Sequence, residues 1–303
     1  MIVAARSQYQ TRVTANEPLC REHFRLVLSL PEFPPTQPGQ FVQIACRELE
    51  VDDCIESVLD WRPGQPVAVH GRELLGPLAL IRRPFSLAGR TDSADGVNLE
   101  IIHRVVGVGT DWMSRLKRGD SVGIIGPLGN RFDLPGPGQL ALLVGGGVGI
   151  PPMLYIAQAL AARGGKAVLF CGATTADLLP IQFDGEPSVH GFPAVLSTDD
   201  GSIGRRGFVT HALEEWLDSG QSSGNPVIYT CGPEPMMKRV AVIAALRELQ
   251  CQVAVERAMA CGMGTCQSCV IRVRLATPRN GRDWAYRLSC TDGPIFRSAE
   301  LLW

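Results

Sequence analysis

The sequence predicts a multi-domain β plus α/β protein: an antiparallel β-barrel, then a doubly wound parallel sheet, then a small cysteine-rich appendix. Three observations predict this order. Short alternating strands broken by proline and glycine fill the front of the chain, strands and helices alternate behind them, and four spaced cysteines stand near the end. We therefore expect domains at residues 1–136, 137–251 and 252–303.

Composition narrows the class of protein. The chain has 303 residues, of which 45% are hydrophobic and 19% charged, as in soluble globular proteins. A formal net charge of -1 gives no reason to expect a nucleic-acid partner. No apolar run is long enough to cross a membrane, and Met1 to Gln10 does not resemble a signal peptide. We expect a cytoplasmic protein with no nucleic-acid or membrane partner.

The first domain is expected to consist of short antiparallel strands. Phe24, Leu26, Leu28 and Leu30 alternate with more polar neighbours, which is the period-2 pattern of a half-buried strand. Further strands are predicted over residues 40–45 and 97–106, and one short helix over 110–117. Strands punctuated by turns in this way are typical of a small barrel or sandwich.

Two short motifs in this half suit a ligand that carries phosphate groups. In Arg83-Pro-Phe-Ser86 the proline holds the arginine extended, and a guanidinium with a nearby hydroxyl matches phosphate oxygens. After the strand over 97–106, Gly107-Val-Gly109-Thr110 opens a helix whose first amides can take a second phosphate contact. Both motifs therefore predict a diphosphate site.

These motifs resemble the flavin-binding motifs of the ferredoxin-NADP reductase superfamily, whose front domain is an FAD-binding antiparallel barrel. The resemblance implies contacts to FAD and its phosphates from Arg83, Pro84, Phe85, Ser86, Ile102, His103, Arg104, Gly109 and Thr110. By residue type alone, His103 is more often a satisfied strand histidine than a catalytic base. The stretch over 46–81, with acidic residues at 48, 50, 52, 53 and 56, is longer than that superfamily usually carries. It is either a solvated surface elaboration or an insert that contacts a partner.

The second domain begins with a continuous apolar strand over residues 140–144, of the kind buried on both faces of a parallel sheet. The strand runs into Gly145-Gly-Gly-Val-Gly149-Ile-Pro-Pro-Met153, and a helix is predicted over 154–163. Amides of such a turn can meet a pyrophosphate at the positive end of a helix. Further strands at 167–171, 194–197 and 227–230, with helices at 208–217 and from 231 to about 249, complete a doubly wound sheet.

The last of these strands ends in Cys231-Gly-Pro-Glu-Pro-Met-Met237. Both glycine turns resemble the nicotinamide-site motifs of the same superfamily, in which a thiol at the Cys231 position lies where hydride crosses to the flavin. The resemblance implies Cys231 as a catalytic residue, against the alternative of a buried strand-end thiol. It implies NAD contacts from Gly145, Gly146, Gly147, Gly149, Gly232 and Pro233. The acidic stretch over 198–202 favours NAD, while Arg205 and Arg206 keep NADP open.

The four cysteines of the appendix have the spacing of iron ligands. Cys261, Cys266 and Cys269 follow the C-x₄-C-x₂-C pattern, and Cys290 comes later, as in a plant-type [2Fe-2S] cluster. A zinc site would more naturally show two C-x₂-C pairs, and disulfides need an oxidising compartment. The pattern therefore predicts an iron–sulfur cluster held by these four thiolates.

The appendix is too short for the complete ferredoxin domain that oxygenase reductases usually attach. Residues 256–269 and 290–296 are similar to the cluster segment of the electron-transfer subunit of NAD-dependent dihydroorotate dehydrogenase, and the resemblance covers nearly the whole chain. One departure is the spacer over 270–289, with Trp284 and Tyr286, which is longer than in that family.

That resemblance implies a relay in pyrimidine biosynthesis. A separate FMN-containing dihydroorotate dehydrogenase subunit oxidises dihydroorotate, electrons pass singly through the [2Fe-2S] cluster to FAD, and hydride goes on to NAD. The expected assembly is a heterotetramer with that subunit. The alternative enzyme is an NAD(P)H:acceptor oxidoreductase subunit of a hydrogenase-like or ferredoxin-linked complex. A different class altogether is a non-catalytic zinc-stabilised binding module, which bound flavin would exclude.

Overall fold

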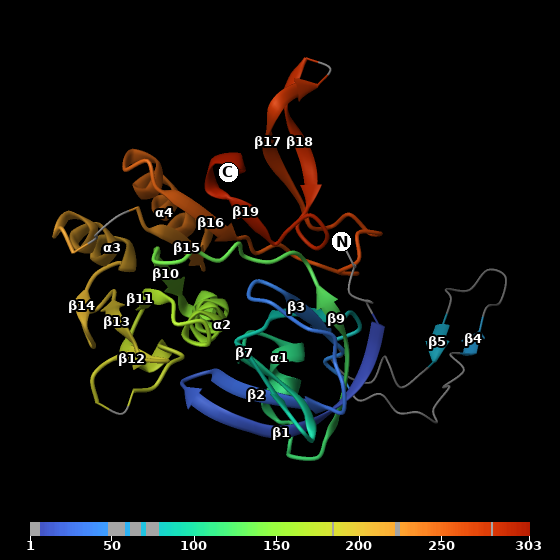
Figure 1. The fold of residues 1–303 in the computed structure, drawn as a ribbon. Coiled ribbons are helices and arrows are strands. Elements are labelled where there is room, and N and C mark those ends of the chain that lie inside the picture. The colour runs from blue at the N-terminus through green and yellow to red at the C-terminus, as the bar shows by residue number, and fades with distance from the viewer. Residues whose placement is uncertain are drawn as a thin grey trace.

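The computed structural model describes residues 7–47, 58–60, 68–70, 79–183, 185–221, 225–279 and 281–303. Two large sheets lie side by side, and a long hairpin extends away from both near the C-terminal end (Figure 1). The acidic residues at 48, 50, 52, 53 and 56, expected to form either a surface elaboration or a partner contact, lie outside the described residues. Of that region, the two short strands β4 (Val58–Asp60) and β5 (Ala68–His70) pair with each other.

The first sheet is antiparallel and curled, in agreement with the predicted barrel. Its strands are β1 (Ser7–Cys20), β2 (His23–Leu30), β3 (Phe41–Ile44), β6 (Arg83–Ser86), β7 (Gly89–Ser93), β8 (Gly96–Arg104) and β9 (Ser121–Leu128). They run in the order β6-β3-β9-β1-β2-β8-β7. Among the described residues of this part there is one helix, α1 (Val108–Ser114), which begins two residues earlier than predicted.

The two faces of strand β3 pack against different parts of the chain. Val42 and Ile44 point into the apolar core of the curled sheet, together with residues such as Leu26 and Leu28 of β2. Because side chains alternate along a strand, Phe41 and Gln43 point the other way. There Phe41 packs with cysteines of the C-terminal segment. The outer face of β3 is therefore covered by the part of the chain that carries the predicted cluster.

The second sheet is the predicted doubly wound sheet. Five parallel strands lie in the order β13 (Phe192–Thr198), β11 (Lys166–Ala173), β10 (Leu140–Gly146), β15 (Val227–Cys231) and β16 (Gln250–Ala254). The short strands β12 (Ser188–Val189) and β14 (Arg205–Arg206) pair with β13. The strand order reverses between β10 and β15, and ligands of such sheets bind beyond the carboxyl ends of the strands at that point.

Helices cover both faces of this sheet. Helix α2 (Ile150–Ala161) packs in one apolar core, whereas α3 (Val209–Asp218) and α4 (Glu234–Leu246) pack in the core of the opposite face. The predicted start of α2 at residue 154 is wrong, since Pro151 and Pro152 belong to its first turn. Proline is tolerated there because the first turn of a helix has no use for those backbone N–H groups.

The C-terminal segment joins the second sheet. The expected boundary between residues 251 and 252 falls inside β16, and β19 (Ile295–Arg297) pairs antiparallel with that strand. The long spacer forms the projecting hairpin of β17 (Val270–Arg279) and β18 (Arg282–Leu288). The division of the chain into three domains stays a prediction.

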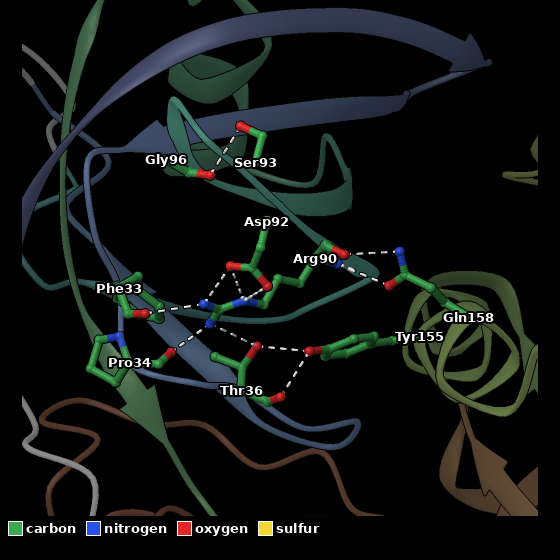
Figure 2. Close-up of polar contacts among 9 residues, drawn as sticks. All are labelled: Phe33, Pro34, Thr36, Arg90, Asp92, Ser93, Gly96, Tyr155 and Gln158. Atoms are coloured by element: carbon green, nitrogen blue, oxygen red, sulfur yellow. Dashed lines mark hydrogen bonds and ion pairs between the residues drawn. The ribbon is translucent and has the colours of Figure 1, made fainter. Parts of the chain in front are cut away.

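A polar contact ties the two sheets together (Figure 2). The Gln158 amide of α2 donates to the carbonyl of Arg90 on β7 at 2.9 Å and accepts from the N–H of the same residue at 3.0 Å. Beside it, the Tyr155 hydroxyl lies 2.7 Å from the Thr36 hydroxyl. The Arg90 guanidinium in turn pairs with Asp92 and donates to carbonyls of the loop before β3. These bonds fix the angle at which the sheets face each other.

Candidate functional site

A cavity of about 1090 Å³ lies between the two sheets. Pockets for small ligands usually hold about 300–1,000 Å³, so this one has room for a large cofactor and a second ligand. The predicted FAD residues that line it are Pro84, Phe85, Ser86, Ile102, His103, Arg104 and Thr110. Of the predicted NAD residues, Gly146, Gly147 and Pro233 line it as well. The fold therefore brings both motif sets to one cavity.

Of the residues predicted for the FAD and NAD sites, six are not among those that line the cavity: Arg83, Gly109, Gly145, Gly149, Cys231 and Gly232. Arg83 is exposed, and its guanidinium donates to the carbonyl of Ile81 at 2.9 Å. Gly109 packs against Cys46, whose Cβ would lie 3.1 Å from a Cβ at position 109. Their assignment as cofactor contacts stays a prediction.

The glycine turns of the second sheet pack against each other at the point where the strand order reverses. A Cβ at Gly149 would lie 2.1 Å from the carbonyl oxygen of Cys231, and one at Gly146 would lie 2.6 Å from the Met236 sulfur. Only glycine allows this approach, since real Cβ contacts are never so short. The thiol of Cys231 is buried, and burial raises its pKa well above the usual value. It is therefore a protonated thiol, and its catalytic role stays a prediction.

His103 is the buried polar group of the flavin-motif side. It is 2% exposed and packs between Phe24 and Phe85, with ring centroids 5.8 and 6.2 Å away. Burial lowers its pKa to about 4, so the imidazole is neutral near pH 7. Neither ring nitrogen has a hydrogen-bond partner among the described residues. A neutral imidazole offers one donor and one acceptor, so a polar cofactor such as FAD fits this wall of the cavity.

Several lining residues were not predicted as contacts. Phe41, Thr174 and Phe208 belong to none of the motifs, whereas Met236 and Glu256 lie inside motifs but were not assigned a contact. Thr174 directly follows β11. Asp199, from the acidic stretch that favours NAD, directly follows β13. The rule that ligands bind beyond the carboxyl ends of parallel strands could have found Thr174. Phe41 and Glu256 reach the cavity only through the packing of distant segments, so the sequence held no signal for them.

The four cysteines of the C-terminal segment lie in two pairs. The Cys261 sulfur accepts N–H bonds from Met263 at 3.3 Å and Cys266 at 3.4 Å. Cys266 lies 3.2 Å from the Ser268 hydroxyl, and this hydrogen bond together with those from neighbouring N–H and thiol groups lowers its pKa to about 6. Cys269 and Cys290 are buried in one apolar cluster, and burial, with the neighbouring Cys269 thiol, raises the pKa of Cys290 to about 12.

This arrangement fits a binuclear cluster. Among the residues with described positions, no three His, Cys, Asp or Glu side chains lie closely enough to hold one metal ion. A [2Fe-2S] cluster instead takes four thiolates, and two pairs supply two for each iron. The loop between the first two cysteines turns through Gly262 and Gly264, with φ of 70° and 90°. Such angles favour glycine, so the backbone can wrap around the sulfurs.

The cysteine pair 269 and 290 lies next to the cavity. Both cysteines pack with Phe41 of β3 and Leu128 of β9 in one apolar cluster. Phe41 also lines the cavity. Phe41 therefore belongs both to the apolar cluster that contains two predicted iron ligands and to the wall of the predicted flavin site.

Comparison with known proteins agrees with these sites. Residues 256–302 match the family model "Iron-sulfur cluster binding domain of dihydroorotate dehydrogenase B", and residues 143–241 match "Oxidoreductase NAD-binding domain". A solved chain of an NADH-dependent reduced ferredoxin-NADP oxidoreductase is 26% identical, with a TM-score of 0.73 over 100% of this chain and 92% of its own. Phthalate dioxygenase reductase, at 19% identity and a TM-score of 0.56 over 94% of this chain and 77% of its own, shares the fold. No helix of the described ranges is long and apolar enough to cross a membrane.

Curated relatives match along most of the chain. The electron transfer subunit of dihydroorotate dehydrogenase B (NAD(+)) from Caldanaerobacter subterraneus subsp. tengcongensis is 31% identical over 98% of this chain and 99% of its own length. The subunit of the same name from Geobacillus thermodenitrificans is 37% identical over 79% of this chain and 86% of its own. With the cavity, the paired cysteines and both family models in agreement, the chain belongs to the family of electron transfer subunits of NAD-dependent dihydroorotate dehydrogenase B.

Proposed function

We propose that this chain takes electrons from an FMN-containing dihydroorotate dehydrogenase subunit at a [2Fe-2S] cluster and passes them through FAD to NAD in pyrimidine biosynthesis. One observation supports this order above the others. Phe41, which is 2% exposed, packs against Cys269 and Cys290 on one side and lines the cavity on the other. A donor at the cluster and an acceptor in the cavity are thus one side chain apart.

When bound, the cofactors would supply the redox chemistry: single-electron transfer at the cluster and, at FAD, the combination of two electrons and a proton into a hydride for NAD. The protein supplies positions. We assign the four cysteines to the irons, the lining residues of β6 and β8 to the flavin, and the glycine turns after β10 and β15 to the nicotinamide nucleotide. The two turns meet where the strand order reverses, so a nucleotide there faces the flavin side across the cavity.

Residues of the chain also give the cavity the apolar, uncharged walls that hydride transfer requires. Its walls include the apolar side chains of Phe41, Phe85 and Ile102, which limit water at the reacting ring. The neutral His103 offers hydrogen bonds without adding a charge. No acid–base pair for dihydroorotate itself is needed here, because that oxidation belongs to the partner subunit.

The relatives named as dihydroorotate dehydrogenase subunits favour this function over the alternative, a reductase subunit of a hydrogenase-like or ferredoxin-linked complex. We further propose a heterotetramer with the FMN subunit, because a relay of this kind needs a donor that docks at the cluster. A cytoplasmic location is part of the proposal, since iron-bound thiolates persist in reducing surroundings.

The test is an anaerobic one. The tagged chain is isolated from its own host, dihydroorotate is added to one sample and NADH to another, and the visible spectrum of each is recorded. Co-purification of an FMN protein, with bleaching of flavin and cluster, is the expected result. Bleaching by NADH alone, with no FMN protein present, would refute the dihydroorotate partner and leave the reductase alternative.

A further inference from the structure

Gln43 is a buried polar side chain that the proposed relay does not yet use. It is 0% exposed on β3, and neither its amide nitrogen nor its amide oxygen has a hydrogen-bond partner among the described residues. Leaving a buried polar group unpaired destabilises the folded state. An apolar residue of the same size would avoid this cost, so the amide is expected to pair with something that the chain holds at this place.

The surroundings of Gln43 point to the cysteine loop. A Cβ at Gly262 would lie 2.9 Å from the Gln43 amide nitrogen and 2.8 Å from its Cγ, so the amide lies flat against the residue that follows Cys261. On β9, the partner directly opposite Gln43 is Ile125, which packs in the apolar cluster around Cys269 and Cys290. The amide is thus enclosed between β3 and the loop that carries the predicted iron ligands.

The flavin side is a less suitable partner. Gln43 stands opposite Pro84 on β6, and Pro84 lines the cavity whereas Gln43 does not. The amide therefore occupies the layer between the two predicted cofactor sites but faces the cluster loop. Sulfur atoms of a reduced cluster and its thiolates carry negative charge and accept hydrogen bonds from N–H groups.

We propose that Gln43 is a positioning residue of the iron–sulfur centre, whose carboxamide N–H donates to sulfur at the Cys261 end of the cluster and so raises its reduction potential. The inference depends on the proposed function, because it requires the cluster. Reduction adds one electron to the cluster and moves no proton. An N–H bond to sulfur stabilises the reduced cluster, which carries the added negative charge, more than it stabilises the oxidised cluster.

The same contact would give Gly262 a second purpose. Its φ of 70° already favours glycine, and any side chain there would push into the Gln43 amide. The loop and the strand can therefore approach this closely only with a glycine at position 262.

The test measures the midpoint potential of the cluster in the flavin-loaded protein by EPR during a dye-mediated redox titration. Gln43→Met and Gln43→Leu keep the approximate shape and remove the N–H donor. Both should lower the equilibrium constant for cluster reduction roughly tenfold, which is about 59 mV for one electron. The midpoint potential of the flavin should not change, and Gln10→Leu, which removes an exposed glutamine of the same sheet, should behave as the wild type.

Three outcomes would overturn the proposal: an unchanged cluster potential in both variants, a shift of the flavin potential in place of the cluster potential, or loss of the cluster from both variants. The last would mean that the amide holds the loop together, since a donor to sulfur only tunes a cluster that four thiolates already bind. Iron and acid-labile sulfide in the wild type are measured first. A wild type without them refutes the cluster itself, and with it the proposed function.

Discussion

Acidification should destabilise the protein through His103. Burial, helped by the nearby positive charge of His23, lowers the pKa of this imidazole from 6.5 to about 4. The unfolded chain therefore binds a proton as the pH falls through 6.5, while the folded chain does not until about pH 4. Stability from the neutral buried ring is complete above pH 6.5 and is lost between 6.5 and 4. The loss should reach about 2 kcal/mol between pH 7 and pH 5, and about 3 kcal/mol in all.

The assay compares urea unfolding of the wild type and His103→Leu at pH 7 and pH 5, followed by circular dichroism. The wild type should lose about 2 kcal/mol more than the variant on acidification. His23, whose pKa burial also lowers, is present in both proteins, so its own burial contributes to both losses. His190→Gln removes an exposed imidazole and should keep the wild-type dependence. Equal losses in wild type and His103→Leu, or an NMR titration of His103 near pH 6.5, would show that burial of this imidazole does not cause the acid sensitivity.

Three further changes have definite expected results. Cys261→Ser should abolish electron transfer from the dihydroorotate partner and keep NADH-to-dye activity, because only the cluster loses a ligand; enzyme assays with each donor check this. Gly149→Ala should cost about 3 kcal/mol and lower the unfolding temperature by roughly 10 °C, because its Cβ would lie 2.1 Å from the Cys231 carbonyl. Gln158→Leu should cost about 2 kcal/mol in chemical unfolding, because two bonds to the Arg90 backbone are lost.

Each of these has a matched control. Cys20→Ser changes a thiol far from the cluster loop in sequence and should keep both activities. Gly107→Ala adds a Cβ that meets no atom of the described residues within 4 Å, and the variant should unfold near the wild-type temperature. Gln10→Leu removes an exposed amide and should cost little. Loss of dye activity in Cys261→Ser, a wild-type unfolding temperature in Gly149→Ala, or unchanged stability in Gln158→Leu would each contradict the corresponding argument.

The parts of the fold that local pattern determines were predictable. The apolar run from Leu140 to Val144 can only be buried on both faces, and it is the centre of the second sheet. β1 was not predicted, because its alternation is weak: Thr11 and Val13 are buried, while most of its other residues face or approach solvent. β19 has three residues and is a strand only because β16 lies beside it. Pairing between distant segments leaves no local trace.

The candidate site divides in the same way. The ligand spacing of the cysteines and the motif residues of β6 and β8 could be read from the sequence because each motif is contiguous or regularly spaced. Phe41 and Gln43 could not, because the loop that covers them follows more than two hundred positions later in the chain. Arg83 is the opposite case, because the motif marks it as a contact but the structure does not place it in the cavity wall. Its guanidinium donates to the carbonyl of Ile81 in its own loop.

The pairing of β16 with β19 has a consequence for how electrons can enter. Ala254 and Ile295 are opposite each other on adjacent antiparallel strands. The segment between them, which includes all four cysteines, is therefore a single long excursion whose two ends lie side by side in the sheet. Both feet of the excursion are therefore anchored in a rigid sheet. A centre held in this way cannot swing out to meet a donor as a tethered carrier would, so the donor must come to it. The same topology allows the segment between the two strands to be deleted and the strands to be joined by a short turn. The shortened chain would be a flavin reductase that cannot exchange electrons with one-electron partners.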